Sequence, residues 1–463
     1  MSDKTLAIFG ASFNPPGLHH TNAAAEIRKL VGGVIVVPCG PRPDKPSTNG
    51  IEPVHRAAMS DLAFGNIDGL EIDLFDLEEA TFTRTHELHQ RYSPRGELWH
   101  VVNADMIAGG REGKSTIHLQ WQHGPELWRQ LSFIVTRQRG ETVDPEDLPP
   151  KHRVVSVDTQ GRSLAIRQRL FAGEPIDDLS PQPVCEYLKR HGLYRDGGRR
   201  RSASLTLGRS PRLLIVADER NPTAMELAKP FREFGVSRDP TCVLVIGGDG
   251  TMLHAIQDHW RLRVPFFGIN AGHLGFLLND ATDVRKSGFP LVEIVSRHMP
   301  LLKVQMLTKD GHWHGGLTFN DAWIERSTGQ TAWMTVRVDG RERIGKLIGD
   351  GLLVSTAAGS TAYARSMGGT PLLIDTPAWM LVGSNILQPI NWKSALLSLE
   401  SQVEVECLNT EKRPMRGFYH GNCIGDVTAM RARVSRIAAV ELAFCTSHDI
   451  TEKIQNLQFM GPD

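Results

Sequence analysis

Two glycine-rich turns hold the side chains in this sequence that are best suited to phosphate chemistry. The first, GASFNPPGLHHT (Gly10–Thr21), follows an apolar strand and precedes an alanine-rich helix. Such a turn brings backbone N–H groups and the positive end of a helix to one point, which suits a phosphate. The imidazoles of His19 and His20, at the start of that helix, can donate to phosphate oxygens. A structural turn with two surface histidines is the alternative interpretation.

The second turn, IGGDGT (Ile246–Thr251), also lies between an apolar strand and a helix. Its glycines, Gly247, Gly248 and Gly250, allow the backbone to approach a ligand closely. Asp249 is presented from this tight turn, where its carboxylate can take a proton from an attacking hydroxyl. A GGDG sequence by itself is equally compatible with a structural turn.

The composition limits the classes of protein that these turns can serve. The chain has 463 residues, with 52 Lys and Arg balanced by 52 Asp and Glu, so no global field favours nucleic acid or an anionic membrane. Its six cysteines are scattered without a CxxC pair, which is typical of reduced thiols. No apolar stretch approaches the length of about eighteen residues that a spanning helix needs, and no signal sequence is visible. We therefore expect a soluble, cytoplasmic protein.

Short apolar runs alternate with helical patterns up to about residue 195, as in TLAIF, GVIVVP, LEIDLFDL, LWHVV, LSFIVT and HRVVSVD. This alternation predicts an α/β domain with a parallel sheet covered on both faces. Residues 197–210 lack periodicity and predict a linker. One more α/β unit follows, and from about residue 300 a two-residue period predicts antiparallel strands, with a hairpin turn at Asp339-Gly340. The predicted boundaries are 1–196, 197–210 and 211–463, the last divided into 211–298 and 299–463.

The first half resembles the nicotinate/nicotinamide mononucleotide adenylyltransferases, whose signature is a glycine turn, Phe-x-Pro and then His-x-Gly-His. The likeness covers residues 5 to about 195, through PRPDKPS, VHRAAM, ATFTRTHEL, VVNADMI, ELWRQLSFIVTRQRG and the segment that begins GRSLAIRQRLF. Two motif positions depart from the family: Gly17 replaces a histidine, and His19 replaces a glycine. Only His20 falls on a family histidine. In the Ser/Thr-rich segment Ser163 and Arg167 match, whereas Gly161 does not.

This resemblance implies a Rossmann-like nucleotidyltransferase fold and a set of roles. His20 and Lys45 would hold the phosphates of ATP, and Arg167 its triphosphate end. His19 is added as a catalytic residue because of its proximity to His20. The remaining expected ATP- or mononucleotide-binding residues are Gly10, Ser12, Phe13 and Ser163, with Thr83, Thr85 and Trp128 lining the pyridine nucleotide pocket and Asp105 near the adenylate ribose.

The second half, from about residue 211 to 463, resembles the NAD kinases. The companions of GGDG that carry this likeness are GINAGHLGFL, FNDAWIE and GDGLLVSTAAGSTAYARSMGG, in the order and spacing of that family. The family's Asn-Glu is Asn320-Asp321 here, and its Pro-Thr is Ala357-Ala358. By resemblance Asp249 would be the general base. The NAD-binding residues would be Gly247, Gly248, Gly250 and Thr251 in the turn, Asn320 and Asp321 at the adenine-side ribose and base, and Ser360 with Asp350, Thr361, Ala362 and Tyr363, the last four lining the nicotinamide half.

Two consecutive reactions on one chain explain the two turns. The first half would make NAD from nicotinamide mononucleotide and ATP, and the second would phosphorylate that NAD to NADP. Mg2+ would accompany ATP, held mostly by substrate oxygens, so we expect no dedicated metal site. ATP, nicotinamide mononucleotide, NAD and NADP are the expected ligands, and a homo-oligomer is expected.

Three alternatives stay open at this point. The N-terminal domain could be an inactive ligand-sensing or scaffolding module attached to a kinase, because of Gly17. Both halves could be binding modules that report NAD levels to a partner, in which case Asp249 would be idle. The first substrate could be the acid mononucleotide instead of the amide.

Overall fold

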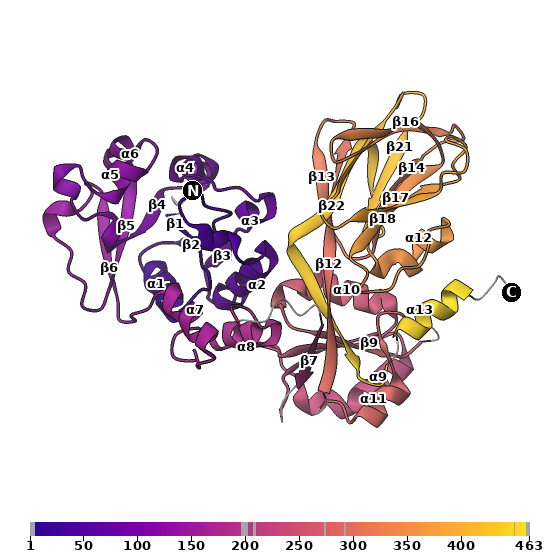
Figure 1. The fold of residues 1–463 in the computed structure, drawn as a ribbon, viewed down its shortest axis with the longest axis horizontal. Coiled ribbons are helices and arrows are strands. Elements are labelled where there is room, and N and C mark those ends of the chain that lie inside the picture. The colour runs from indigo at the N-terminus through magenta and orange to yellow at the C-terminus, as the bar shows by residue number, and fades with distance from the viewer. Residues whose placement is uncertain are drawn as a thin grey trace. The chain divides into compact units, whose positions relative to one another are not determined.

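The computed structural model of the chain describes residues 5–195, 202–206, 210–272, 275–290, 293–448 and 450–459. By its internal contacts the chain divides into two units, residues 1–200 and 201–463 (Figure 1). None of the helices in these described ranges is long and apolar enough to cross a membrane.

The N-terminal unit is built on one parallel sheet. Its strands are β1 (Leu6–Ala11), β2 (Gly33–Pro38), β3 (Leu70–Ile72), β4 (Leu98–Asn103), β5 (Ser132–Gln138) and β6 (His152–Val157). They are ordered β3-β2-β1-β4-β5-β6, with every pair parallel. This doubly wound, Rossmann-like order confirms the predicted fold class, and it places the carboxyl ends of β1 and β4 side by side, where ligands bind in such folds.

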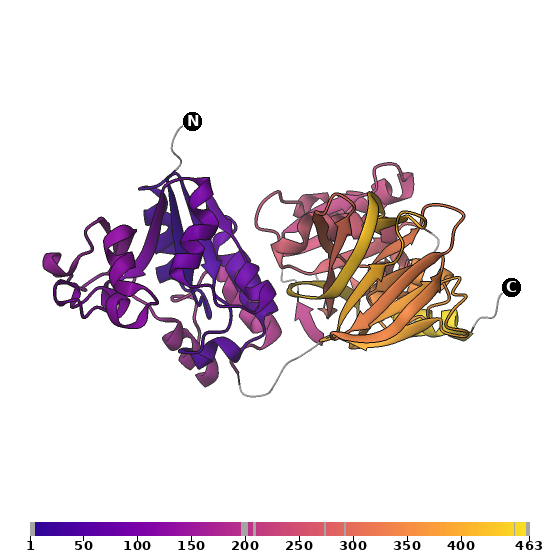
Figure 2. The same cartoon turned by 90° about the horizontal axis from the view of Figure 1, so that it is seen from above.

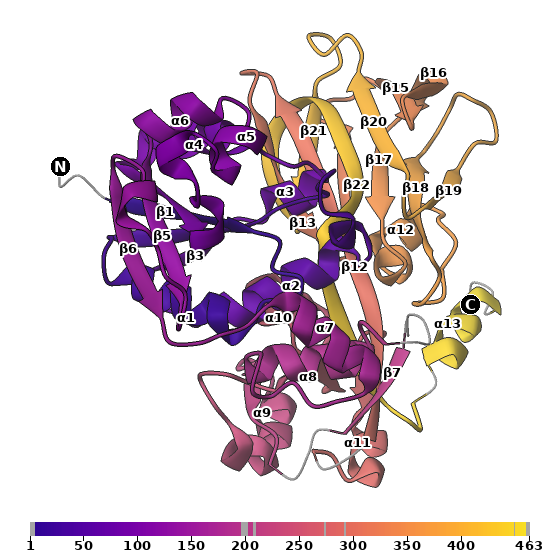
Figure 3. The same cartoon turned by 60° about the vertical axis from the view of Figure 1, so that its left-hand side comes forward.

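Helices cover both faces of this sheet (Figure 1 and Figure 3). One face packs against α1 (Leu18–Arg28), α2 (Pro53–Phe64), α7 (Ser163–Ala172) and α8 (Gln182–His191), and the other against α4 (Thr85–Tyr92), α5 (Thr116–Gln120) and α6 (Gly124–Gln130). Alternate side chains of β1 serve the two faces: Ala7 and Phe9 join the first core, whereas Leu6 and Ile8 join the second. The two-residue period of a strand produces this division.

The segment LEIDLFDL is not the full strand that its apolar residues predict. Only Leu70–Ile72 is strand, and a short helix, α3 (Phe75–Glu79), follows. The carboxylate of Asp73 accepts a hydrogen bond from the N–H of Phe75 at 3.1 Å. This local bond competes with strand pairing and starts the helix.

The C-terminal unit begins with an α/β part. It contains β8 (Leu213–Ala217), α9 (Pro222–Ala228), β9 (Cys242–Gly247), α10 (Asp249–His259), β10 (Phe266–Asn270), β11 (Asn279–Asp280) and α11 (Ala281–Ser287). Strands β8, β9 and β10 are parallel neighbours. The second glycine turn therefore joins a buried central strand to a helix, as predicted.

Antiparallel strands form the rest of this unit. They are β12 (Glu293–Thr308), β13 (Trp313–Thr318), β14 (Asp321–Arg326), β15 (Ala332–Val338), β16 (Arg341–Gly349), β17 (Gly351–Ser355), β18 (Ala378–Ser384), β19 (Ser394–Ser398), β20 (Gln402–Cys407), β21 (Met415–Tyr419) and β22 (Asn422–Cys445), with the helices α12 (Tyr363–Ser366) and α13 (Ile450–Phe459). Asp339 and Gly340 join β15 to β16 with φ of 52° and 72°. The predicted hairpin turn is confirmed, because two positive φ angles define the favoured two-residue turn.

Strands β12 and β22 join the two parts of the C-terminal unit (Figure 1 and Figure 2). They pair with each other from Ile294–Cys445 to Thr308–Val427, and the end of β22 runs parallel to β10. The boundary expected between residues 298 and 299 thus falls inside β12 and is not a break in the chain's structure. One long strand carries the same alternation through both cores, so the pattern contains no signal at their junction.

Part of the predicted linker is also a strand. β7 (Ser202–Thr206) pairs antiparallel with the beginning of β12, from Thr206–Glu293 to Ser202–Arg297. An edge strand presents unpaired N–H and C=O groups that another backbone segment can satisfy without a strong sequence pattern. Apart from β7 and Ser210, residues 197–210 lie outside the described ranges.

Candidate active sites

The first glycine turn positions His20 as a hydrogen-bond donor. Gly17 is the N-cap of α1, and its N–H donates to Nδ1 of His20 at 3.1 Å. An imidazole that accepts at Nδ1 carries its proton at Nε2 when neutral. Burial, followed by the charges of His19 and Lys45, lowers the pKa of His20 well below its usual value. His20 is therefore neutral at pH 7 and has an Nε2–H group to offer.

His19 fills the space that two glycines leave free. Its ring lies 3.9 Å from the ring of His20, centroid to centroid. A Cβ at Gly17 would lie 2.8 Å from Nδ1 of His19, and a Cβ at Gly161 would lie 2.7 Å from the same atom. Burial lowers the pKa of His19 to about 4. The departures from the family pattern at 17, 19 and 161 are therefore in contact with one another.

Positive charge surrounds the same turn. Nζ of Lys45 donates to Oγ of Ser12 at 2.9 Å, and Nη1 of Arg167 donates to the carbonyl of Asn14 at 2.6 Å. Burial lowers the pKa of Lys45, and the neighbouring charges of Arg42 and Arg167 add to that effect. Oγ of Ser163 donates to the carbonyl of Pro15 at 2.8 Å. The structure thus gathers six of the expected residues around one turn, namely Ser12, His19, His20, Lys45, Ser163 and Arg167.

Buried groups hold the turn in this shape. The guanidinium of Arg56 is buried and donates to the carbonyls of Ser12 and Cys39, each at 2.6 Å. Phe13 has a φ of 40°, and its buried ring packs edge-on against His20 at 5.0 Å. Gly10 is exposed at the end of β1. Phe13 therefore packs directly against His20, whereas a Cβ at Gly10 would make an ordinary contact with Cδ1 of Leu88 at 3.8 Å.

The expected pyridine nucleotide residues lie on other elements. Oγ1 of Thr83 donates to the buried carboxylate of Asp76 at 2.5 Å, and Thr85 is the first residue of α4. Asp105 is exposed just beyond the end of β4, beside β1. Trp128 is buried in the core, with its ring 4.5 Å from that of His118. Their roles in a nucleotide pocket stay predictions.

The second turn presents Asp249 in a fixed orientation. Asp249 is the first residue of α10, and its carboxylate accepts the N–H groups of Phe276 and Leu277 at 3.1 and 3.0 Å. Burial raises the pKa of Asp249, whereas these two hydrogen bonds and the charge of Lys453 lower it. A carboxylate whose pKa is raised toward neutrality is a better general base than an exposed one.

The three glycines of this turn differ in the space that surrounds them. A Cβ at Gly247 would lie 2.4 Å from Oγ1 of Thr251, so the start of α10 packs directly on Gly247. A Cβ at Gly248 or Gly250 would have no atom of the described structure within 4 Å. The turn is therefore tight on the inside and open on the side where a ligand can approach the backbone.

Asn320 offers an unused acceptor. Its Oδ1 is buried and has no hydrogen-bond partner among the described residues. A Cβ at Gly359 would lie 2.4 Å from the carbonyl oxygen of Asn320, so the segment after β17 wraps closely around this residue. Burial raises the pKa of the neighbouring Asp321 to about 6. An unsatisfied buried oxygen is costly, and a ligand hydroxyl or amino group would satisfy it.

Three of the other expected NAD residues are already engaged within the protein. Asp350 accepts from Nε of Arg326 at 2.6 Å and from Nδ2 of Asn385 at 2.8 Å. Burial alone would raise the pKa of Asp350, but these hydrogen bonds hold it below its usual value. Ser360 is buried and donates to the carbonyl of Ala357 at 2.6 Å. Oγ1 of Thr361 donates to the carbonyl of Ala358 at 3.4 Å.

Tyr363 is the most accessible of the expected NAD residues on this segment. It is 39% exposed, and its ring lies 5.1 Å from that of Trp323 in an edge-on arrangement. Ala362 immediately precedes α12, which starts at Tyr363. Trp323 was not expected from the motifs, although it follows Asn320-Asp321 in FNDAWIE. The exposed side chain of Tyr363 is therefore accessible to a ligand.

Two further histidines, His420 and His254, lie outside the motifs that carry the family resemblance. His420 has a φ of 51° in the turn between β21 and β22. Burial lowers the pKa of His420, and the charge of His254 on α10 lowers it further.

One group of potential metal ligands occurs among the described residues. The carboxylates of Asp280 and Asp283 and the imidazole of His448 have atoms within 4.8 Å of one another. The ammonium of Lys453 already lies 2.9 Å from Oδ1 of Asp280. A cation provided by the protein therefore balances this acidic group.

Known proteins match both units. Residues 211–285 match the family described as ATP-NAD kinase N-terminal domain. An NAD kinase of Rickettsia bellii (strain OSU 85-389) is 31% identical over 249 residues, which are 54% of this chain and 97% of that protein. The chain belongs to the NAD kinase family. An NAD kinase of Rickettsia rickettsii (strain Sheila Smith) is 34% identical over the same shares. Residues 8–168 match the Cytidylyltransferase-like family.

Two solved structures are also similar. An NAD kinase from Archaeoglobus fulgidus in complex with ATP is 18% identical, with a TM-score of 0.40, over 54% of this chain and 98% of that chain. Yeast NADH kinase complexed with NADH is 15% identical, with a TM-score of 0.41, over 79% of this chain and 89% of that chain. The NAD kinase family match falls in the C-terminal unit and the nucleotidyltransferase match in the N-terminal unit. The predicted fusion of two transferase domains is confirmed at this level.

Proposed function

We propose that the chain catalyses two consecutive reactions, each with ATP as its Mg2+ complex. The N-terminal unit transfers the adenylyl group of ATP to nicotinamide mononucleotide, giving NAD and pyrophosphate. The C-terminal unit transfers the γ-phosphate of a second ATP to the 2′-hydroxyl of the adenosine ribose of NAD, giving NADP and ADP. The observation that supports this proposal best is the pair of glycine turns, one ringed by phosphate-binding donors and the other presenting a buried carboxylate.

In the first reaction, a phosphate oxygen of the mononucleotide bonds to the α-phosphorus of ATP. The bond from that phosphorus to the bridging oxygen breaks, and pyrophosphate leaves with the electron pair. The protein's contribution is alignment and neutralisation of the charge that develops on the phosphates. Nε2–H of His20 and the cationic groups of Lys45 and Arg167 are the donors placed to supply it.

In the second reaction, the 2′-oxygen of the ribose bonds to the γ-phosphorus and ADP leaves. Asp249 takes the hydroxyl proton, and the N–H groups of Phe276 and Leu277 keep its carboxylate oriented. Asn320, through its unused Oδ1, and Asp321 hold the adenine-side ribose and base. The exposed face of Tyr363 lies against the nicotinamide half.

Replacing Asp249 by Asn tests the second reaction. Loss of a general base costs on the order of 10² or more in rate. We expect NADP formation from NAD to fall by that factor, while pyrophosphate release from nicotinamide mononucleotide and ATP continues unchanged. Retention of more than about a tenth of the kinase rate would show that Asp249 is not the base.

Replacing His20 by Ala in the full chain tests the first reaction. Pyrophosphate release should fall at least tenfold, and by somewhat less for His19→Ala, because the helix start loses a donor to the phosphates. The exposed His152, replaced by Ala, is the matched control. If the unaltered chain binds mononucleotide and releases no pyrophosphate, the N-terminal unit is an inactive sensing or scaffolding module.

The amide mononucleotide is the proposed first substrate because only its product is directly phosphorylated by the second unit. Comparing kcat/KM for the amide and acid forms decides this point. A preference for the acid of more than about tenfold, equivalent to about 1.4 kcal/mol of transition-state binding, would contradict direct succession of the two reactions.

A further inference from the structure

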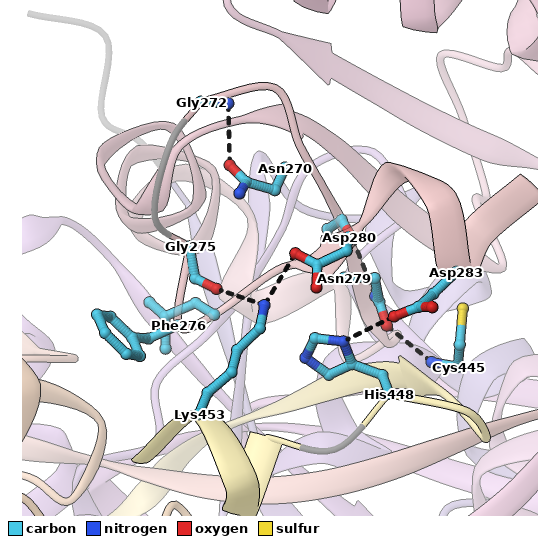
Figure 4. Close-up of polar contacts among 12 residues, drawn as sticks. Asn270, Gly272, Gly275, Phe276, Asn279, Asp280, Asp283, Cys445, His448 and Lys453 are labelled. Carbon is cyan, nitrogen blue, oxygen red and sulfur yellow. Dashed lines mark hydrogen bonds and ion pairs between the residues drawn. The ribbon is translucent and has the colours of Figure 1, made fainter. Parts of the chain in front are cut away.

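One peptide group connects the C-terminal helix to Asp249. The N–H of Phe276 donates to Oδ2 of Asp249 at 3.1 Å, and the C=O of the same peptide group belongs to Gly275. That carbonyl accepts a hydrogen bond from Nζ of Lys453, on α13, at 3.3 Å. Figure 4 shows the ammonium of Lys453 between the Gly275 carbonyl and the carboxylate of Asp280.

Other contacts of α13 hold Lys453 in this place. Oδ1 of Asp280 accepts from Nζ at 2.9 Å. Ile454, the next residue, is 3% exposed and joins the core that also contains Met252 of α10. Nε2 of Gln458 donates to the carbonyl of Pro371 at 2.7 Å. The helix is therefore docked at Lys453 and at two residues that follow it, and the ammonium is directed at the peptide group.

A cation on a carbonyl oxygen strengthens the N–H group of the same peptide as a donor. Hydrogen bonds in a chain polarise one another, and the effect grows where water is scarce. Lys453 therefore acts on Asp249 in two ways: it fixes the peptide group that binds the carboxylate, and it makes that group a stronger donor.

We propose that Lys453 is a positioning residue for phosphoryl transfer, holding the Gly275-Phe276 peptide group so that the Asp249 carboxylate stays fixed and ionised for proton abstraction. This inference rests on the proposed role of Asp249 as the base. It assigns a function to α13, which none of the glycine-turn motifs includes.

The charges around Asp249 predict the direction in which its pKa changes when Lys453 is replaced. Burial raises the pKa of Asp249, and the charge of Lys453 lowers it, so removing that charge raises the pKa further. The base must be unprotonated to accept the hydroxyl proton. When the charge of Lys453 is removed, the loss of activity on lowering the pH should therefore begin at a higher pH. Three further ionisable groups lie around Lys453. Asp280, at the end of β11, contacts its ammonium, and Asp283 of α11 and His448 before α13 belong to the same group of side chains.

Variants of Lys453 in the full chain test the proposal through NADP formation from NAD and ATP. Lys453→Met removes the cation but keeps the length of the side chain, and Lys453→Arg keeps a cation. For Lys453→Met we expect kcat to fall on the order of tenfold, the size of one typical hydrogen-bond contribution, with KM for NAD changed less than about threefold. The acidic limb of the pH–rate profile should move to higher pH in Lys453→Met. Lys453→Arg should keep most of the original kcat and most of the original position of that limb. Gln455→Met, exposed on the same helix, is the matched control and stays unchanged.

Two results would overturn the proposal. The first is an unchanged kcat and pH profile for Lys453→Met. The second is a fall in activity that accompanies a lower melting temperature and that Arg does not restore, which would make Lys453 a stability residue only. Asp249→Asn separates this failure from that of the proposed function: an active Asp249→Asn chain refutes the base, whereas an inactive one beside an unaffected Lys453→Met chain refutes the positioning role alone.

Discussion

The histidine at position 19 should be exchangeable with the glycine at position 17, but only if both residues change together. The family order is His-x-Gly-His, and this chain has Gly17-Leu18-His19-His20. In the structure the ring of His19 lies where a side chain at position 17 would begin. Gly17→His alone should therefore impair NAD synthesis, and the double variant Gly17→His with His19→Gly should recover it.

The magnitude follows from the contacts at Gly17. Its φ of −120° and ψ of 172° are ordinary extended backbone, so a side chain there meets no backbone strain. Its Cβ would, however, lie 2.8 Å from Nδ1 and Cε1 of His19 and 2.9 Å from Cδ1 of Ile166. Overpacking of this kind costs about 1–3 kcal/mol, which corresponds to roughly 5- to 150-fold in kcat/KM if the displaced histidines bear it. Removing the His19 ring leaves only the flexible end of Ile166, so the coupling between the two changes should be about 1–3 kcal/mol.

The assay is pyrophosphate release from nicotinamide mononucleotide and ATP by the full chain, for both single variants and the double variant. NADP formation from NAD is the internal control, because the second turn belongs to the other unit. An unimpaired Gly17→His chain would show that His19 does not occupy this space in the working enzyme. Additive losses in the double variant would show that a histidine at 17 cannot replace one at 19.

Two further predictions concern pH and stability. Because burial raises the pKa of Asp321 to about 6, this carboxylate is protonated at lower pH, and KM for NAD should rise as pH falls through about 6. Asp321→Asn should remove that dependence, and a flat KM between pH 5 and 7 in the unaltered chain would contradict the role of Asp321. Arg56→Lys should lower the free energy of unfolding of the N-terminal unit by about 2–3 kcal/mol, because an ammonium cannot bridge the carbonyls of Ser12 and Cys39 as the guanidinium does. Denaturant unfolding measures this change, and an unchanged midpoint would show that the bridge is not needed.

Most of the secondary structure was predictable because its pattern is local. The parallel strands of the N-terminal unit are continuous apolar runs, and the Asp339-Gly340 turn has the composition that positive φ requires. The prediction that the strand continues after Ile72 was wrong for an equally local reason. The N–H of Phe75 donates a hydrogen bond to the carboxylate of Asp73 and a helix starts there. A short polar side chain can redirect the backbone where apolar periodicity alone favours a strand.

Features that depend on distant pairing were not predictable. Strand β12 belongs to both parts of its unit because β22 pairs along its whole length, and β7 is a strand because β12 offers it an edge. Neither partner is near in sequence, and two-residue alternation looks the same in either core. The boundary predicted at residue 298, where the two-residue period begins, therefore falls inside one continuous strand.

The candidate sites also combine features that are local in the sequence with features that depend on distant residues, and this affects how motifs are interpreted. Asp249, Asn320 and His20 could be proposed from the sequence because each lies inside a motif. His19 and Gly161 are 142 positions apart in the sequence, yet the absence of a side chain at Gly161 makes room for the imidazole of His19. Lys453 reaches the Gly275 carbonyl from a helix outside every motif. What a phosphate or a general base requires is a group at a place in space, so a departure from a motif at one position is evidence of lost function only when no other residue fills that place. At the first turn the ring of His19 lies where a side chain at position 17 would begin, and we propose that it fills that place.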